Sequence, residues 1–370
     1  MSQGYKELSV YKNNLMVKYS IGLDIGKEKI YTCFSMLDEK QQLFVKRSSS
    51  FPNNSKGFVK LSEWINKERK LLDAVLIVIM EATGVYHEQC ALYLYEQGFD
   101  ITVVLPNKAK KYIAALGIKT KNDKSDAAAL SHMGARQSMD LWKPMGRYFY
   151  ELRCLTRHHE SLQEQKTATC NQIEAIENSM YCNKEVMKSL KKILKTLEAA
   201  ILSTEIAIKI HIQSNEEVYK KVKNIITIKG VGLHTIAVIL AESNGFLLFK
   251  NQSQLISYAG YDVVENQSGK HVGKTKISKK GNSHIRRALH MPSLCTVTHK
   301  EPIFLNIYNR TFERHKIKMK SYTAIQKKLL CLIYTLWKNN TPYDREYHTK
   351  IITREEEVEH SSRFDFEEVG

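Results

Sequence analysis

The sequence predicts an α/β domain, followed by a long helical segment and a mainly helical C-terminal region. Two patterns carry this prediction. Between Lys18 and about Gly134, short apolar segments alternate with amphipathic ones, which is typical of strands that alternate with helices. Between Tyr148 and Lys229 there is no Pro or Gly, and aliphatic residues recur every three or four positions, as they do in long helices.

Five strands are expected in the N-terminal domain. The first three follow one another across short polar turns, and the last two are continuous apolar segments, which is typical of strands buried on both faces of a parallel sheet. The segments are Tyr19–Ile25, Ile30–Met36, Leu43–Arg47, Ala74–Met80 and Ile101–Leu105. Helices are expected around Phe58–Ile65, over Tyr86–Gln97 and over Asp123–Met133. Three meander strands followed by strand–helix alternation are the layout of a ribonuclease H-like domain.

The helical segment predicts two long helices, packed as an antiparallel hairpin or a coiled coil. Its apolar stripe is interpreted as core, and a face of the hairpin is a candidate for dimerisation. We place the three domains at 18–140, 148–223 and 225–340. An acidic tail over 343–370 is expected to be solvated and disordered.

The composition points to a nucleic-acid partner. The 370 residues contain 56 Lys and Arg against 39 Asp and Glu, a net charge of +17, and the acidic tail makes the rest of the chain still more basic. Excess positive charge over a folded body favours a polyanion as partner, although a basic protein that binds none is the alternative. No segment pairs a basic face with an aromatic one, so binding to a membrane surface is not expected.

Other classes of protein are excluded by simple counts. The 6 Pro and 17 Gly are too few for a collagen-like chain, and 43% hydrophobic residues exclude disorder for most of the sequence. No apolar segment approaches the roughly 20 residues of a membrane span, and the N-terminus lacks the apolar core of a secretory signal. The seven cysteines form no CxxC pair, so we expect a cytoplasmic protein without structural zinc or a disulfide framework.

Four acidic residues occupy positions that suit a two-metal site. Asp24 ends the first predicted strand, Glu81 directly follows the fourth, and Asp123 and Asp126 lie three apart on one helix. Ligands bind at the carboxyl ends of strands in open α/β sheets, and converging carboxylates repel one another unless divalent metal neutralises them. Two Mg²⁺ (or Mn²⁺) ions there would activate a nucleophile and stabilise the leaving oxygen of a phosphodiester. Each acid alone also fits a surface residue, and Asp123 fits a helix cap.

The segment Ile228–Gly232, with the sequence IKGVG, lies between two apolar helical stretches. It matches a helix–hairpin–helix pattern, in which Gly230 and Gly232 let backbone N–H groups approach a DNA phosphate at a helix N-terminus. The alternative is an ordinary tight connection between two helices.

A basic segment follows in the same region. Lys270–Arg287 contains seven Lys and Arg and no acidic residue, which favours a phosphate-binding surface over a merely solvated one. Its candidate contacts are Lys276, Lys279, Lys280, Arg286 and Arg287, with Lys270 and Lys274 nearer its start. Just before it, Ser268 lies in the polar loop NQSG, where a turn serine is a commoner interpretation than a nucleophile.

Four motifs taken together resemble the DEDD transposases of the insertion sequence 110 family. They are LDIGKEK, MEATGVY, LPNKAKKYIAALGIKTKNDKSDAAAL and YAGYDVVENQSGKHVGKTKISKKGNSHIRRAL, in collinear order from about Ile21 to Leu294. The resemblance implies a RuvC-like N-terminal domain, a coiled-coil connection and a C-terminal transposase domain. It matches Asp24, Glu81, Asp123 and Asp126 to the family's D-E-D-D acids, and Ser268 to its serine nucleophile.

The resemblance also implies an activity. The family recombines DNA under the guidance of a structured RNA encoded in the element, and its serine attacks a DNA phosphate to form a 5′-type phosphoserine link or its equivalent. The metal-bound acids would assist the reaction from another subunit. The protein would form a dimer or a tetramer and would act in the nucleoid of a bacterial or archaeal cell. Two alternatives from the residues stay open. One is a metal-dependent nuclease or junction resolvase in which Ser268 is structural, and the other is a nucleic-acid-binding protein without catalysis.

Overall fold

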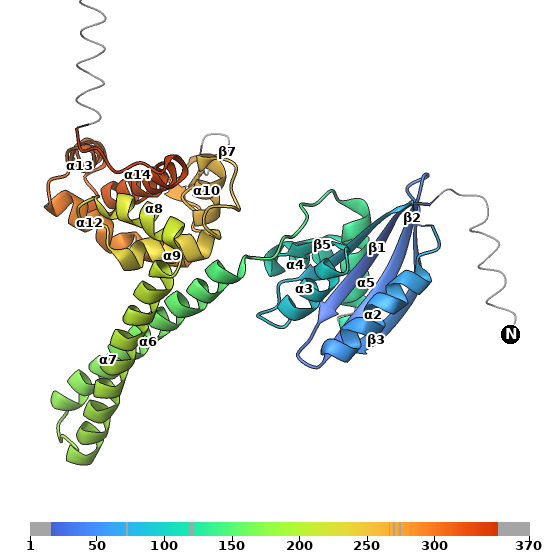
Figure 1. Ribbon diagram of the computed structural model, residues 1–370, viewed down its shortest axis with the longest axis horizontal. Helices are drawn as coiled ribbons and strands as arrows, with labels where there is room; N and C mark the ends of the chain where they lie inside the picture. Colours follow the sequence, from blue (N-terminus) through green and yellow to red (C-terminus); the bar gives the residue numbers. More distant parts are fainter. Residues whose placement is uncertain are drawn as a thin grey trace, which may run out of the picture. The chain divides into compact units, whose positions relative to one another are not determined.

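The computed structural model describes residues 16–71, 73–117, 122–265, 267–268, 271–273 and 275–346, without the side chains of Met16, His271 and Val272 (Figure 1). The chain divides into two compact units, 1–144 and 145–370, so the two long helices belong to the same unit as the C-terminal region. Among the described residues, no helix combines the length and the apolarity needed to span a bilayer.

The N-terminal unit is built on a five-stranded mixed sheet in the order β3-β2-β1-β4-β5. The strands β1 (Met16–Ile25), β2 (Lys29–Asp38) and β3 (Leu43–Pro52) form an antiparallel meander, and β4 (Val75–Glu81) and β5 (Asp100–Val104) add to it in parallel. This confirms the mixed sheet expected of a ribonuclease H-like domain. β3 extends five residues beyond the predicted Arg47, because a serine-rich stretch without apolar alternation pairs with β2.

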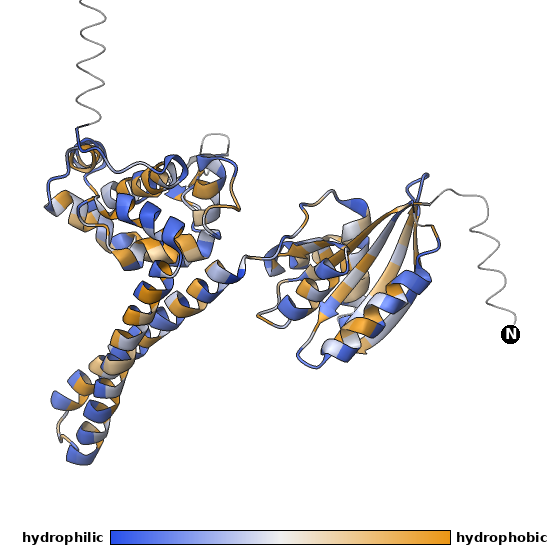
Figure 2. Ribbon diagram, viewed as in Figure 1, coloured by the Kyte–Doolittle hydropathy of each residue, from blue (hydrophilic) through white to orange (hydrophobic). Residues whose placement is uncertain are grey.

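Helices cover both faces of this sheet. On one face lie α2 (Ser55–Glu68) and α3 (Glu88–Glu96), whose buried side chains pack against Tyr19, Ile21 and Leu23 of β1. Figure 2 shows that α2 carries both hydrophobic and hydrophilic residues. On the other lies α5 (Asp123–Arg136), while α4 (Pro106–Ala115) packs against α5. The sequence did not predict α4. Its Pro106, which looked like the end of a strand, occupies the first turn, where a missing N–H costs nothing.

The packing of α5 on β1 is unusually close. A Cβ atom on Gly22 would lie 2.0 Å from the carbonyl oxygen of Ala127 and 2.3 Å from the backbone nitrogen of Ser131. Ser131 donates a hydrogen bond of 2.7 Å to the carbonyl of Ser20, and Gly134 approaches the side chains of Ser20, Ile77 and Ile79. Only glycine and small polar residues allow this approach, so the sequence of β1 fixes where α5 lies on the sheet.

The C-terminal unit is mainly helical, as predicted. Its helices are α6 (Arg147–Glu177), α7 (Lys184–Gln213), α8 (Glu216–Ile226), α9 (Leu233–Ser243), α10 (Gln252–Ala259), α11 (Ser283–Ala288), α12 (His290–Thr298), α13 (Pro302–His315) and α14 (Lys318–Asn339). The ends of α6 and α7 join α8–α14 in one apolar core. Residues 343–346 contact this unit through Tyr343, whose hydroxyl donates to Glu301, and the rest of the predicted tail lies outside the described residues.

The two long helices run side by side in opposite directions (Figure 1). Their polar contacts show the antiparallel direction, because the residue numbers of the partners rise along α6 while they fall along α7. His159 pairs with Glu205 at 3.1 Å, Lys166 with Glu198 at 3.0 Å, and Glu177 with Lys191 at 3.8 Å. The prediction of two long helices is therefore confirmed, but a third helix, α8, begins at Glu216 within the stretch that was expected to hold only these two.

We expect Gly22→Ala to destabilise the N-terminal unit by roughly 3 kcal/mol, because the atoms that the new methyl group meets belong to the α5 backbone and cannot rotate away. Thermal unfolding measures this. Gly146→Ala is the control, since its nearest neighbour would lie at an ordinary 3.8 Å. Equal melting temperatures for Gly22→Ala and the wild type would show that α5 does not lie this close to β1.

Candidate acidic site

The carboxyl edge of the sheet brings two of the four predicted acids together. Leu23 of β1 is paired with Met80 of β4, and Asp24 and Glu81 are the next residues along these parallel strands. Alternate residues of a strand point to opposite faces. Ser20 and Gly22 face α5, so Asp24 faces it too. Ile77 and Ile79 also contact α5, so Glu81 lies on the same face.

The N-terminus of α5 supplies the other two acids. Because α5 runs antiparallel to β1, its first turn, with Asp123 and Asp126, lies toward the end of the strand where Asp24 stands. Asn122 caps the helix: its side chain accepts from the Ser125 backbone nitrogen at 2.8 Å, and the Ser125 hydroxyl accepts from the Asn122 nitrogen. The interpretation of Asp123 as the cap is therefore wrong, and its carboxylate has no capping role.

The charges of the other three acids act on Asp24. Burial is the first cause that raises the pKa of Asp24 to about 6, and the negative charges of Asp123, Asp126 and Glu81 raise it further. All three acids thus lie near enough for their charges to act on Asp24, although about a hundred residues separate Asp24 from Asp126. A site that makes ionisation of its own carboxylate costly favours a cation as its occupant.

The donor set suits a hard divalent metal, because carboxylate oxygens are the ligands that Mg²⁺ and Mn²⁺ prefer. The side chains are not arranged as a closed chelate, however. Among the described residues, no group of three or more His, Cys, Asp or Glu side chains is placed to hold a metal ion directly. The acids fit the metal in chemistry and in position, and side-chain rotation would have to complete the coordination.

Ser268 lies in the other unit, on a narrow β-ribbon. The base of the ribbon is β6 (Val263–Val264) paired with β9 (Lys276–Ile277), and beyond it β7 (Gln267–Ser268) pairs with β8 (His271–Val272). Ser268 is exposed and stands opposite His271 next to the tip. Gly269, Lys270 and Lys274 lie outside the described residues.

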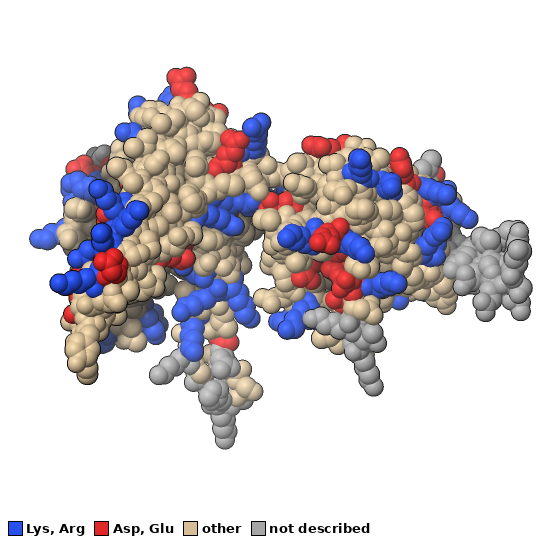
Figure 3. Space-filling model, turned by 90° about the horizontal axis from the view of Figure 1, so that it is seen from below, with Lys and Arg blue, Asp and Glu red and all other residues tan. Residues whose placement is uncertain are grey.

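The basic segment divides into two groups. Lys276, Lys279 and Lys280 are exposed (Figure 3 shows Lys and Arg spread over the surface). The two arginines instead contact the protein itself. Arg286 donates to the carbonyls of Ala259 and Asn282 at 2.8 and 3.2 Å, and Arg287 pairs with Glu160 and Glu164 of α6. Sequence reasoning missed these partners, which lie far away in the chain.

The IKGVG segment joins α8 to α9. Gly230 has a φ of +92°, and a Cβ there would lie 2.9 Å from the Cβ of Cys295, so this glycine serves both the turn and the packing against α12. Gly232 begins α9 as its N-cap and has no neighbour within 4 Å of a Cβ position. One glycine is therefore structural, and the other leaves the helix N-terminus accessible.

Comparisons with known proteins agree with these motifs. A family model of IS110-type DEDD transposases, described as a transposase, matches residues 21–181, and a model described as the transposase IS116/IS110/IS902 family matches residues 222–309. A pilin gene-inverting protein of Moraxella lacunata is 28% identical over 90% of this chain and 100% of its own length. A transposase for insertion sequence element IS1111A of Coxiella burnetii is 22% identical over 73% of this chain and 75% of its own.

Among solved structures, Thermus thermophilus RuvC is similar to 34% of this chain and 99% of its own, at 12% identity and a TM-score of 0.26. This overall similarity is low, and the sequence matches weigh more.

We expect Mg²⁺ or Mn²⁺ to raise the melting temperature of the N-terminal unit by about 5 °C, because metal bound only to the native state stabilises it by mass action. Asp126→Asn should abolish the response. Without metal this variant should be no less stable than the wild type, since it removes one of the charges that repel Asp24. Asp100→Asn, at the opposite edge of the sheet, is the matched control and should respond like the wild type. A metal response that survives in Asp126→Asn would contradict the site.

Proposed function

Because this chain belongs to the IS110 family of insertion-sequence transposases, we propose that it cleaves and exchanges DNA strands with an acidic metal site and a serine nucleophile. The observation that supports the proposal is that β1, β4 and α5 place four acids toward one edge of the sheet, where the charges of three of them raise the pKa of Asp24. An edge that concentrates negative charge would repel DNA unless a cation mediated the contact.

Asp24, Glu81, Asp123 and Asp126 are the residues that would hold Mg²⁺ or Mn²⁺. Bound there, the metal would polarise a phosphodiester and lower the pKa of an attacking or leaving oxygen. The protein's own contribution is positional. Asp24 and Glu81 extend from rigid, paired strands, and the capped first turn of α5 holds the other two acids. Such placement supports catalysis because the backbone positions of the acids are already fixed, so that only their side chains need to rotate.

Ser268 is proposed to attack the phosphate. Its Oγ–phosphorus bond forms as the bond from phosphorus to the leaving strand oxygen breaks. The serine proton passes to a base, and the leaving oxygen takes up a proton. Its exposed position on the β-ribbon suits attack on a bulky substrate. A serine hydroxyl needs a base, a metal or a strongly positive environment to react, and Lys276 at the base of the ribbon contributes to the last of these.

The phosphate backbone is proposed to run along the exposed lysines. Lys276, Lys279 and Lys280 carry charge that no ion pair among the described residues neutralises, and the open N-terminus of α9 at Gly232 offers backbone N–H groups. Guidance by a structured RNA and assembly into a dimer or tetramer are further parts of the proposal. The family resemblance supports both.

The name of the Moraxella relatives bears on the kind of reaction. By their name, the two Moraxella relatives invert a pilin gene. An alignment that spans 90% of this chain supports strand exchange at defined sites for this chain as well.

A second candidate, a metal-dependent nuclease or junction resolvase, is favoured by one observation. The four acids and Ser268 belong to different compact units, and all four acids lie within residues 24–126 of one unit. In that case water attacks the phosphate, Ser268 is structural, and no covalent intermediate forms.

Ser268→Ala should abolish covalent capture of a suicide DNA substrate while leaving DNA binding within about twofold of wild type, because the hydroxyl makes the bond but little of the contact surface. Denaturing gel electrophoresis of the adduct measures this. Ser278→Ala, on the same segment, is the control and should still form the adduct. Cleavage that persists in Ser268→Ala, or an adduct mapped to Ser278 or Ser283, would favour the nuclease.

Replacing Lys276, Lys279 and Lys280 by Gln should lower the slope of log affinity against log salt by about 0.9 for each duplex phosphate that a lysine no longer neutralises. Arg287→Gln should leave the slope unchanged, because this arginine is already paired with Glu160 and Glu164. Fluorescence anisotropy between 50 and 300 mM salt, roughly the range in which phosphate contacts dominate, gives the slopes. An equal decrease of slope in both variants would show that the arginine pairs open on binding.

A further inference from the structure

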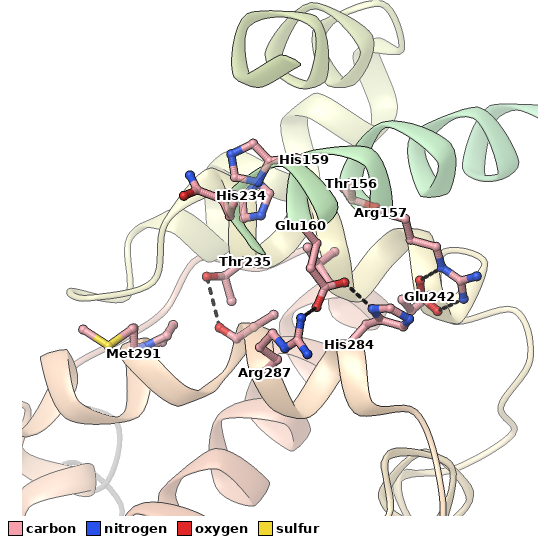
Figure 4. Close-up of a pocket in the computed structure, with 14 residues that line it drawn as sticks. Thr156, Arg157, His159, Glu160, His234, Thr235, Glu242, His284, Arg287 and Met291 are labelled. Atoms are coloured by element: carbon pink, nitrogen blue, oxygen red, sulfur yellow. Dashed lines mark hydrogen bonds and ion pairs between the residues drawn. The ribbon is translucent and has the colours of Figure 1, made fainter. Parts of the chain in front are cut away.

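The C-terminal unit contains a cavity of about 390 Å³ that the proposed chemistry does not use (Figure 4). Its walls come from three parts of the chain. Helix α6 contributes Arg157, His159, Glu160 and Gln163, helix α9 contributes His234, Thr235, Val238 and Glu242, and the α11–α12 region contributes His284, Arg287, Ala288, Met291 and Pro292. The volume lies within the range of roughly 300–1,000 Å³ that is typical of small-molecule sites.

The charges that line the cavity are neutralised by one another. Glu242, whose side chain is 2% exposed, accepts two hydrogen bonds from Arg157, at 2.7 and 3.0 Å, and one of 2.7 Å from Asn282. Glu160 pairs with His284 and Arg287, as the dashed lines in Figure 4 show. A metal cation would find no free carboxylate among these wall residues, and a free anion no free guanidinium. A ligand whose buried portion carries no net charge therefore fits these walls best.

Two imidazole rings also line the cavity, and the Nε2 of one of them, His159, already pairs with Glu205 of α7. His159 and His234 lie with their ring centroids 4.2 Å apart, and burial lowers the pKa of His234 to about 4, so this imidazole is neutral with one donor and one acceptor nitrogen. The buried Nδ1 of His234 has no hydrogen-bond partner among the described residues. Val238, Ala288, Met291 and Pro292 supply apolar surface.

Flat apolar surface with hydrogen-bonding groups around it is the chemistry that recognises an unstacked base. We propose that this cavity takes up an unpaired nucleobase of a nucleic-acid strand whose phosphates lie along the neighbouring lysines. The inference that the ligand is a nucleic-acid strand rests on the function proposed above. The inference that a nucleobase enters the cavity rests on the cavity itself.

The path of the chain supports this assignment. Helix α11, which carries His284, Arg287 and Ala288 into the wall, begins three residues after Lys280. Asn282 caps α11 by accepting from the Ile285 nitrogen, and the same amide donates to Glu242 inside the cavity. The lysines and the cavity wall are thus parts of one rigidly held segment, which suits a strand that is bound by its backbone and inserts one base.

The test compares the full chain and three variants, in EDTA so that no cleavage occurs. Fluorescence anisotropy measures the affinity for a single-stranded 12-nucleotide DNA of mixed sequence, for the matching RNA and for the DNA duplex. Ala288→Leu, which fills the cavity, and His234→Ala, which removes a ring, should each weaken single-strand binding about tenfold, as removal of one stacking partner of a base does. Duplex affinity should stay unchanged, because a paired base cannot enter.

The matched control is His158→Ala, since His158 neighbours His159 on α6 but is exposed and does not line the cavity. It should bind all three probes like the wild type. Deoxyadenosine at millimolar concentration should shift the ring signals of His159 and His234 in ¹⁵N-histidine spectra, and inorganic phosphate should not. Histidine signals that no nucleoside moves would overturn the base site. Single-strand affinity that is unchanged in both cavity variants would overturn the strand as its ligand. Neither result depends on strand cleavage, so a failure of the proposed catalysis remains distinguishable.

Discussion

The close packing of α5 on Gly22 is the constraint on which the acidic site depends. Backbone of the helix meets backbone of β1 with no room for a side chain. This contact, reinforced by the hydrogen bond from Ser131 to Ser20, sets the position of the helix along the strand. The first turn of α5 consequently stands over the carboxyl edge of the sheet, and two acids reach Asp24 from a hundred residues away. The contact between α5 and Gly22 thus contributes both to the stability of the unit and to the placement of the acids.

That arrangement carries an electrostatic cost which is informative about function. Asp123 and Asp126 suit a helix N-terminus, where the macrodipole favours negative charge, but their repulsion of Asp24 opposes its ionisation. A cation at the proposed metal site would offset this repulsion.

The sequence predicted the fold where burial leaves a periodic signal. The central strands, the long helices and the acids at strand ends were all readable from local patterns, because each depends on its near neighbours. The serine-rich half of β3 and the helix after Pro106 were not, since the first lacks alternation and the second starts at a residue that usually ends elements. The partners of Arg286 and Arg287, and the cavity, depend on residues that lie far apart in the chain, so no local spacing could reveal them.

In the helical unit, ion pairs determine which basic side chains stay unpaired. Glu160 and Glu242 sit beneath a basic segment and pair with Arg287, Arg157 and, through an amide, Asn282. These contacts hold α11 and the preceding chain in place, and they leave the exposed lysines unpaired for a polyanion. The proposed function uses these two features, the carboxylates of one unit for a metal and the lysines of the other for phosphate.

The most direct test of the proposed metal site is anomalous diffraction from crystals soaked in Mn²⁺. We predict a peak at the carboxyl edge of the sheet, within coordination distance, about 2.2 Å, of oxygens from Asp24 and at least two of Glu81, Asp123 and Asp126. A map without a peak at this edge, or with manganese bound elsewhere while the four carboxylates point apart, would contradict it.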